Sequence, residues 1–211
     1  MNRLASLVLL MACAGAVCAQ MPAPDALIRT QTQEVLTIIK QDKDMRTGNT
    51  RKILDMVDAK VLPYFDFNRM TMLAVGRPWR DANPAQRELL VKEFRTLLVR
   101  TYSSAIELYK NQTIDVRPVS IQPSDTEVTV KTVINQPGTQ PVHMDYRMEK
   151  TPQGWKAFDV TAEGVSLVTS YRSTFANEVA RGGVDGLIKS LAEKNAKLET
   201  EPPRSARADK Q

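Results

Sequence analysis

The spacing of the apolar residues changes twice along this chain, and this change constrains the fold more than any other feature. Up to about residue 110 they recur at the 3.6-residue period of a helix, and from Ile114 to Ala162 they alternate as in a strand. From about Ser166 the helical period returns. Because the turns inside the alternating block are short and rich in Pro, Gly and Asp, we expect an α+β fold with an antiparallel sheet.

Three helices are predicted in the first third of the chain. The first runs to about residue 40 and is capped by Asp25 or Thr30, and the second spans about residues 50–61. Asp66 is placed to cap the third, which stops where Gly76 supplies a permissive backbone.

A fourth and longest helix begins with Asn83 as the N-cap and Pro84 at the first helical position, and extends to about residue 110. Its bulkiest apolar residues share one side, which predicts a helix laid on an apolar surface. That side carries Leu90, Phe94, Leu97, Leu98, Thr101, Ala105, Leu108 and Tyr109.

Four strands and two further helices complete the prediction. The strands are expected at residues 114–121, 127–134, 142–149 and 155–162, and the helices at about 166–181 and 184–198. The chain is therefore predicted to form a four-stranded antiparallel sheet covered by about six helices. Alternation places on one face of the third strand Val142, Met144, Tyr146 and Met148, and on one face of the fourth Phe158, Val160 and Ala162.

The first 19 residues have the pattern of a secretory signal peptide: a charged start, a short apolar run and small residues before a cleavage point. Both cysteines, Cys13 and Cys18, lie in this segment, so we expect a mature domain over residues 20–199 without a disulfide or a reactive thiolate. No later apolar stretch is long enough for a membrane span, which predicts a soluble exported product. The charged tail at residues 200–211 is predicted to be disordered.

The charge and the catalytic residue types exclude several functions. The formal net charge is +5, but Lys and Arg are interleaved with acidic residues, whereas nucleic-acid binding requires a denser basic cluster. His143 is the only histidine and falls on the polar face of its strand. Ser166 follows Gly164 but lacks the second glycine of a nucleophile elbow, and it is better placed to cap a helix. No metal-ligand or phosphate-loop pattern is present, so the sequence favours a binding protein over an enzyme.

The segment 154–175 carries the most specific motifs, and others precede it. They are Gly154-Trp155-Lys156, Asp159-Val160, Glu163-Gly164-Val165-Ser166-Leu167 and Tyr171-Arg172-Ser173, preceded by Tyr64-Phe65-Asp66-Phe67, Gly76-Arg77-Pro78-Trp79-Arg80, Gln86, Phe94, Leu97-Leu98, Tyr102 and Tyr146. On these motifs, roughly residues 25–198 resemble the MlaC family, the periplasmic phospholipid-binding proteins also called toluene-tolerance auxiliary proteins.

The resemblance implies a function and partners. Such a protein encloses an apolar cavity between a curved sheet and its helices, takes up the acyl tails of a phospholipid, and needs no cofactor beyond this cargo. It is a periplasmic carrier, expected to be monomeric, between the outer-membrane lipoprotein MlaA with its porin and the inner-membrane ABC transporter that includes MlaD. Its role is to maintain the lipid asymmetry of the outer membrane, and the expected direction of transport is retrograde.

Alternation and the family motifs together suggest which side chains form the tail pocket, although a sequence alone does not separate a cavity wall from a solid core. The predicted tail-binding residues are Met72, Phe94, Leu98, Tyr102, Tyr146, Met148, Phe158, Val160, Leu167, Tyr171 and Phe175.

Four further residues are candidates for polar or partner contacts. Arg147 and Arg172 could hold a phosphate through two guanidinium hydrogen bonds, or could be surface arginines paired with nearby acids. Trp79, as an exposed aromatic beside Arg80, is a candidate anchor for a partner protein.

Two other interpretations stay open. One is a small α+β enzyme of the cone-shaped type that acts on an apolar substrate, which a buried Asp159 shifted toward its neutral form would favour. The other is a structural adaptor without a ligand cavity.

Overall fold

The computed structural model describes residues 21–103 and 111–200, and the predicted signal peptide, the tail beyond residue 200 and the end of the long helix lie outside these ranges. The helices are α1 (Pro24–Gln41), α2 (Lys43–Arg46), α3 (Thr50–Lys60), the 3-10 helix η1 (Leu62–Tyr64), α4 (Phe67–Val75), α5 (Pro78–Asp81), α6 (Pro84–Tyr102) and α8 (Leu167–Thr200). The strands are β1 (Thr113–Val116), β2 (Glu127–Asn135), β3 (Val142–Thr151), β4 (Gly154–Ala162) and β5 (Val165–Ser166). Within the described residues, no helix is both long and apolar enough to cross a membrane.

The five strands form one antiparallel sheet in the order β1-β2-β3-β4-β5. The α+β class and the antiparallel pairing are confirmed, but the sheet has one strand more than predicted. The additional strand, β5, has only two residues and follows a turn in which Glu163 and Gly164 both have positive φ, so no periodicity marks it. β1 ends earlier than predicted because Pro118 has no N–H to continue the ladder.

Helix boundaries follow local capping where a polar side chain is available. Asp66 accepts the N–H of Arg69 at 2.8 Å and begins α4, and Gly76 with φ 71° ends it, both as predicted. Asn83 and Gln86 form a reciprocal capping box at the start of α6.

The prediction for the start of α1 is wrong. The N-cap is Ala23, which offers no side-chain hydrogen bond, and Asp25 instead lies in the first turn. Pro24 starts the helix because its fixed φ suits the first helical position.

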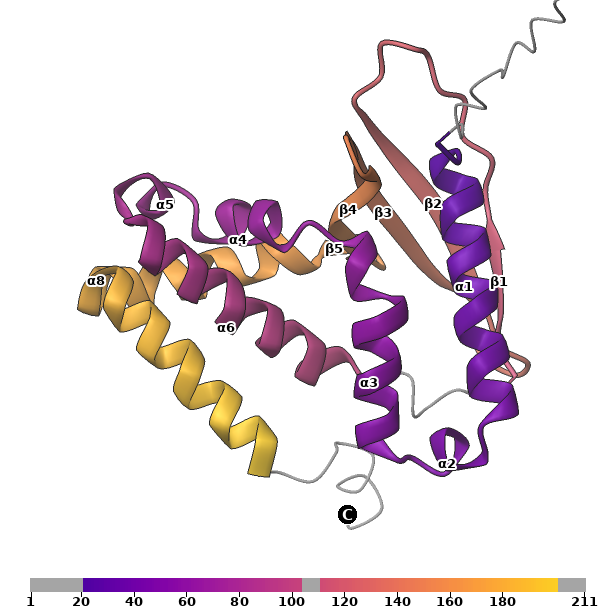
Figure 1. The fold of residues 1–211 in the computed structure, drawn as a ribbon, viewed down its shortest axis with the longest axis horizontal. Helices are drawn as coiled ribbons and strands as arrows, with labels where there is room; N and C mark the ends of the chain where they lie inside the picture. Colours follow the sequence, from indigo (N-terminus) through magenta and orange to yellow (C-terminus); the bar gives the residue numbers. More distant parts are fainter. Residues whose placement is uncertain (1–20, 104–110, 201–211) are drawn as a thin grey trace, which may run out of the picture.

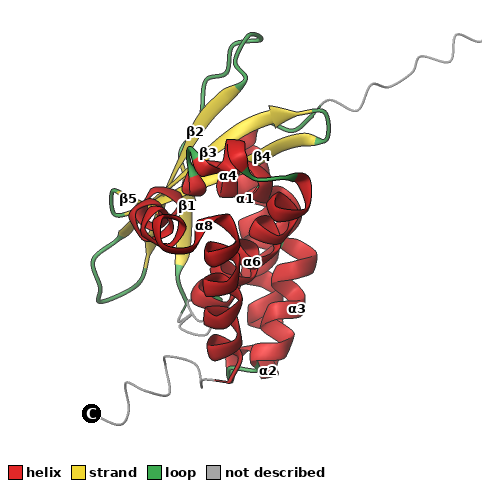
Figure 2. Cartoon of the chain, turned by 90° about the vertical axis from the view of Figure 1, so that its left-hand side faces the viewer, coloured by secondary structure: helices red, strands yellow, loops and turns green. Residues whose placement is uncertain are grey.

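The sheet and the helices form two sides of the molecule, as Figure 2 shows. In Figure 1, α1 lies beside β1 and β2, while α4, α5, α6 and α8 form a separate helical group on the other side of α3. Each part has its own core. The helical group buries Phe94, Phe158 and Phe175, and α1 with the sheet buries Leu27, Val130 and Met148. A third core joins α1, α2 and α3 through Ile39, Met45, Ile53, Met56 and Val57.

A β-bulge in β4 connects the sheet to the helical group. Arg147 of β3 pairs with Asp159, whereas the next residue, Met148, pairs with Ala157, which leaves Phe158 as the additional residue. Phe158 is fully buried in the core of the helical group, while Ala157 packs in the core beneath α1. The expectation that Phe158 shares a face with Val160 is therefore wrong, because the bulge shifts the alternation by one residue.

The last helix reverses direction at a glycine. Gly183 has φ 67° and ψ −166°, which breaks α8 where the sequence predicted the end of one helix and the start of another. This combination of angles is accessible almost only to glycine.

We predict that Gly183→Ala lowers the free energy of unfolding by about 1–3 kcal/mol, because alanine is strained at this φ and ψ. The matched control is Gly182→Ala, which has ordinary helical φ and free space around a new Cβ. The control should raise the free energy of unfolding by about 0.5–1 kcal/mol. Urea unfolding followed by circular dichroism measures both, and equal effects of the two substitutions would contradict the assignment of the break.

Candidate functional site

An apolar cavity of about 290 Å³ lies between the sheet and the helices α3, α4 and α6. Its sheet wall consists of Met144 and Tyr146 of β3 and Val160 and Ala162 of β4. Met144 pairs with Ala162 and Tyr146 with Val160, so all four side chains lie on the same face of the sheet.

The opposite walls come from helices that are far apart in the sequence. Val57 belongs to α3, Met70 to α4 and Leu98 to α6, and Leu167 closes the cavity at the start of α8. The other lining residues are Val61, Leu62, Phe65, Phe67, Val99, Tyr102 and Ser103. Tyr102 is 41% exposed, so the cavity reaches the surface at the end of α6.

The lining determines what the cavity can hold. No described lining residue is charged, and the polar side-chain atoms in this set are the hydroxyls of Tyr102, Ser103 and Tyr146. Transfer of hydrocarbon from water into such a space is favourable, whereas an ion would lose its hydration without a compensating hydrogen bond or charge. The cavity is therefore suited to an apolar ligand.

Tyr146 is the polar residue at the centre of the sheet wall. Burial raises the pKa of its hydroxyl to about 12, so the phenol stays protonated at any physiological pH. Among the described residues no hydrogen-bond partner of this hydroxyl is found, and the side chain borders the cavity.

Five of the predicted tail-binding residues line this cavity, and six do not. Leu98, Tyr102, Tyr146, Val160 and Leu167 are brought together around it. Phe94, Phe158, Tyr171 and Phe175 instead pack in the helical core, where the ring of Phe94 meets those of Tyr171 and Phe175 edge to face at 5.1 Å. Met148 is fully buried beneath α1.

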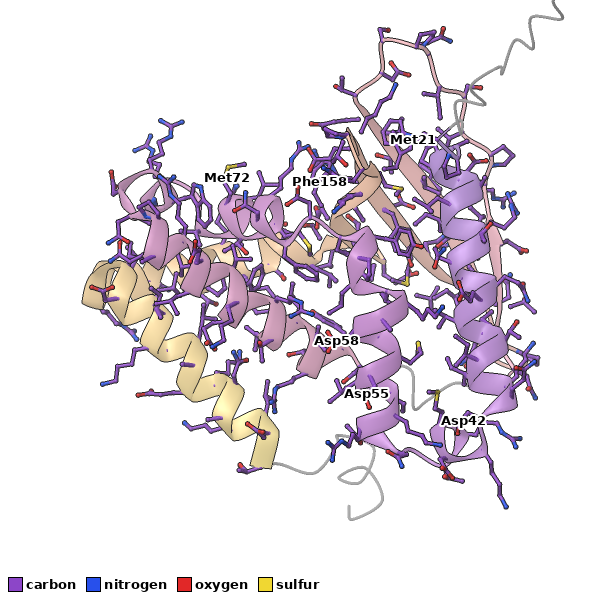
Figure 3. The ribbon with its side chains drawn as sticks, in the orientation of Figure 1. Met21, Asp42, Asp55, Asp58, Met72 and Phe158 are labelled. Atoms are coloured by element: carbon purple, nitrogen blue, oxygen red, sulfur yellow. The ribbon has the colours of Figure 1, made fainter. Side chains whose placement is uncertain are left out.

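Met72 lies away from the cavity. It is 38% exposed and projects outward from α4, as Figure 3 shows, because Met70, Thr71, Ala74 and Val75 form the buried side of this short helix. Met72 follows Thr71 directly, and neighbouring residues of a helix point in different directions, so Met72 lies outside the buried side.

The lining residues supplied by α3 and the segment after it are not among the residues predicted from the sequence. Val57 and Val61 are spaced by four residues and Leu62 follows, which is the helical spacing that marks a common face. That spacing could have identified a wall, but not whether the wall faced a core or a cavity.

Neither candidate phosphate-binding arginine lies in the cavity lining. Arg172 donates two hydrogen bonds to the carbonyl oxygen of Leu73, at 3.2 and 2.9 Å, and so satisfies the C-terminal turn of α4. Arg147 lies 4.8 Å from the ring centre of Phe158 and 3.9 Å from the carboxylate of Glu127.

Trp79 does not have the exposure that an anchor residue requires. It is 8% exposed and belongs to the helical core, with the guanidinium of Arg87 5.5 Å from its ring centre. The short helix α5 turns the ring inward, and the neighbouring Arg80 remains exposed.

Asp159 and Ser166, the residues most suggestive of catalysis, cap the start of α8. Asp159 is 2% exposed, and its carboxylate accepts hydrogen bonds from the Ser166 hydroxyl at 2.7 Å and the Val168 N–H at 3.3 Å. The Ser166 oxygen accepts the N–H of Thr169 at 3.0 Å, which confirms the predicted cap. Neither residue borders the cavity, and within residues 21–103 and 111–200 no cluster of metal-binding side chains occurs.

Comparison with known proteins gives consistent similarities. A family model described as MlaC protein matches residues 29–193. Toluene tolerance protein ttg2D of Pseudomonas putida is 23% identical over 192 residues, covering 87% of this chain and 88% of the relative. The intermembrane phospholipid transport system binding protein MlaC of Haemophilus influenzae is 20% identical over 172 residues, covering 80% of each.

A solved structure supports the same fold. The phospholipid-binding protein of Ralstonia solanacearum, in complex with a phospholipid, superposes with a TM-score of 0.79 at 40% identity. The match covers 85% of this chain and 100% of that one.

We predict that the raised pKa of the Tyr146 phenol makes stability depend on alkaline pH. The pKa is raised from the unfolded value of about 10, so the unfolded chain ionises first and stability is lost as pH rises from 10 toward 12. Between pH 9 and 11, urea unfolding should show the wild type losing about 1 kcal/mol more than Tyr146→Phe. Parallel losses in both proteins would contradict the raised pKa of this hydroxyl.

Proposed function

This chain belongs to the MlaC family, and on that premise we propose that it is a carrier that sequesters the acyl tails of phospholipids in its apolar cavity. The cavity between the sheet and α3, α4 and α6 is the observation that carries the proposal. It favours a carrier over a structural adaptor, which would have no ligand cavity. The complex of the Ralstonia solanacearum relative with a phospholipid supports the choice of ligand.

The free energy of moving a lipid through water explains why a carrier needs such a cavity. At about 0.8 kcal/mol per methylene, one chain of about 16 carbons costs roughly 12 kcal/mol when exposed to water. A protein lining of Leu, Val, Met and Phe replaces bilayer hydrocarbon with an environment of similar free energy. Exchange with a membrane then remains reversible, while release into water is strongly disfavoured.

The size of the cavity sets a further condition on binding. At about 290 Å³ it lies just below the range of roughly 300–1,000 Å³ that is usual for ligand pockets. A diacyl lipid would therefore require the walls to separate. We propose α3 as the wall that moves, because it packs in a core separate from the helical group.

The polar ties of α3 to its neighbours are weak enough to permit this movement. Lys60 pairs with Glu34 of α1 at 2.7 Å, and Asp58 pairs with Arg95 of α6 at 2.6 Å. All four side chains are more than one third exposed, and such surface pairs contribute at most about 1 kcal/mol each. Figure 3 places Asp58 on the side of α3 that faces α6.

The cellular role follows from the same family. We propose export to the periplasm after removal of residues 1–19, and transfer of lipid as a monomer between MlaA with its porin and the MlaD-containing transporter. The name of the Haemophilus influenzae relative, a binding protein of an intermembrane phospholipid transport system, supports this role. Arg80, which is exposed, remains a candidate partner contact. The proposal assigns no reaction to Asp159 or Ser166, because both are engaged in capping α8.

The direct test is to extract the gently purified protein with organic solvent and identify the extract by mass spectrometry. We expect near-stoichiometric phospholipid from the wild type. Val160→Glu should reduce the extracted lipid at least about tenfold, because it places a carboxylate in an apolar cavity.

The matched control is Val165→Glu, which puts the same charge on the neighbouring strand at a position that is 60% exposed. It should retain the lipid of the wild type. Ala162→Phe, which fills the cavity without adding charge, is a second variant in case Val160→Glu fails to fold. Full lipid content in a folded Val160→Glu protein, or a lipid-free wild type, would refute the proposal.

A further inference from the structure

The hydroxyl of Tyr146 has no hydrogen-bond partner among the described residues, and its half-buried side chain borders an apolar cavity. Its ring lies among Val130, Met148 and Val160, where phenylalanine would fill the same space. A ligand that fills the cavity removes water from this hydroxyl, and a hydroxyl left without any hydrogen bond is destabilising. The ligand therefore has to supply the partner that the protein does not.

Once the cavity is filled, a retained water molecule is poorly suited to this role. A buried water molecule needs about two to four polar partners, and the sheet wall around Tyr146 offers only apolar side chains. The other described lining hydroxyls, those of Tyr102 and Ser103, belong to the end of α6 and not to the sheet. Tyr102 is also 41% exposed, so solvent can satisfy its hydroxyl.

We propose that the Tyr146 hydroxyl donates a hydrogen bond to an ester carbonyl oxygen of the bound lipid, and so selects acyl esters over ligands that are only hydrocarbon. This inference rests on the proposed function and names the chemistry that the cavity recognises. An ester carbonyl accepts hydrogen bonds but carries no charge, so it enters an apolar cavity without the desolvation cost of an ion. It is also covalently attached to the chain that fills the cavity.

The state of the phenol is suited to this contact. Because its pKa is about 12, it keeps its proton and remains a donor across the whole physiological range. An arginine or lysine at this position would offer a stronger donor but would bring a buried charge. Tyrosine supplies one directional hydrogen bond and an otherwise apolar surface.

The test compares two lipids that differ only in the linkage of their tails. Dipalmitoyl phosphatidylglycerol carries two ester carbonyls, whereas the dihexadecyl ether analogue has the same headgroup and chain length but no carbonyl. Competition for the delipidated protein should favour the ester by about three- to tenfold. Tyr146→Phe should bind both lipids equally, and Tyr64→Phe, the control that removes a phenol hydroxyl outside the cavity lining, should keep the preference.

The outcomes separate this inference from the proposed function. If the wild type binds both lipids equally, or Tyr146→Phe retains the ester preference, the role of Tyr146 is refuted while lipid binding stands. If neither lipid binds the wild type, the proposed function itself fails. Palmitic acid forms a third arm: if Tyr146→Phe weakens its binding but not that of the diester, the acceptor is a free carboxyl group and the ester assignment is overturned.

Discussion

The structure depends on one apolar face of its sheet that helices shield from water. The helices pack closely on part of this face and leave a cavity over the rest. α1 packs directly on part of that face and forms a solid core with Val130 and Met148. Over Met144, Tyr146, Val160 and Ala162 the side chains of α3, α4 and α6 leave a space unfilled, and this space is the cavity. Apolar side chains are thus packed together in three separate cores, while those around the cavity leave space between them. A binding protein requires this division, because the cores supply stability that does not depend on the ligand.

The bulge in β4 links these parts. It directs Phe158 into the helical core, where the guanidinium of Arg69 lies 3.6 Å from the ring centre and also pairs with Glu127 and Glu149. The next residue, Asp159, caps α8, and Val160 returns to the cavity wall. Consecutive residues therefore serve the core, the last helix and the cavity. A regular strand could not do this, since its alternation offers only two directions.

Most of the helices and strands could be predicted from the sequence, as could five of the residues that line the cavity. Capping by Asp66, Asn83 and Ser166 was readable because it depends on side chains a few residues apart. The side on which Phe158 lies could not be predicted in the same way. A bulge depends on pairing with another strand, and no nearby residue marks the shift in alternation that it causes. For the same reason Leu98 and Phe94 are equally apolar on one helix side, yet the first borders the cavity and the second lies in the core. That distinction arises from how far apart the helices stand, which periodicity does not encode.

The two-residue length of β5 affects how the edge of this sheet can meet the sheet of a second molecule. A long exposed edge strand offers unpaired N–H and C=O groups on which the sheet of a second molecule can grow. Here one edge ends after Val165 and Ser166 and passes directly into α8, and the other edge, β1, is four residues long and is followed by Pro118. β5 covers only Thr161 and Ala162 of β4, and the rest of the β4 edge is interrupted by the bridge from Phe65 to Ala157 and by the bulge at Phe158. Short and bulged edges of this kind hinder intermolecular sheet growth. An open apolar cavity and a sheet that resists edge-to-edge pairing can therefore coexist in one chain.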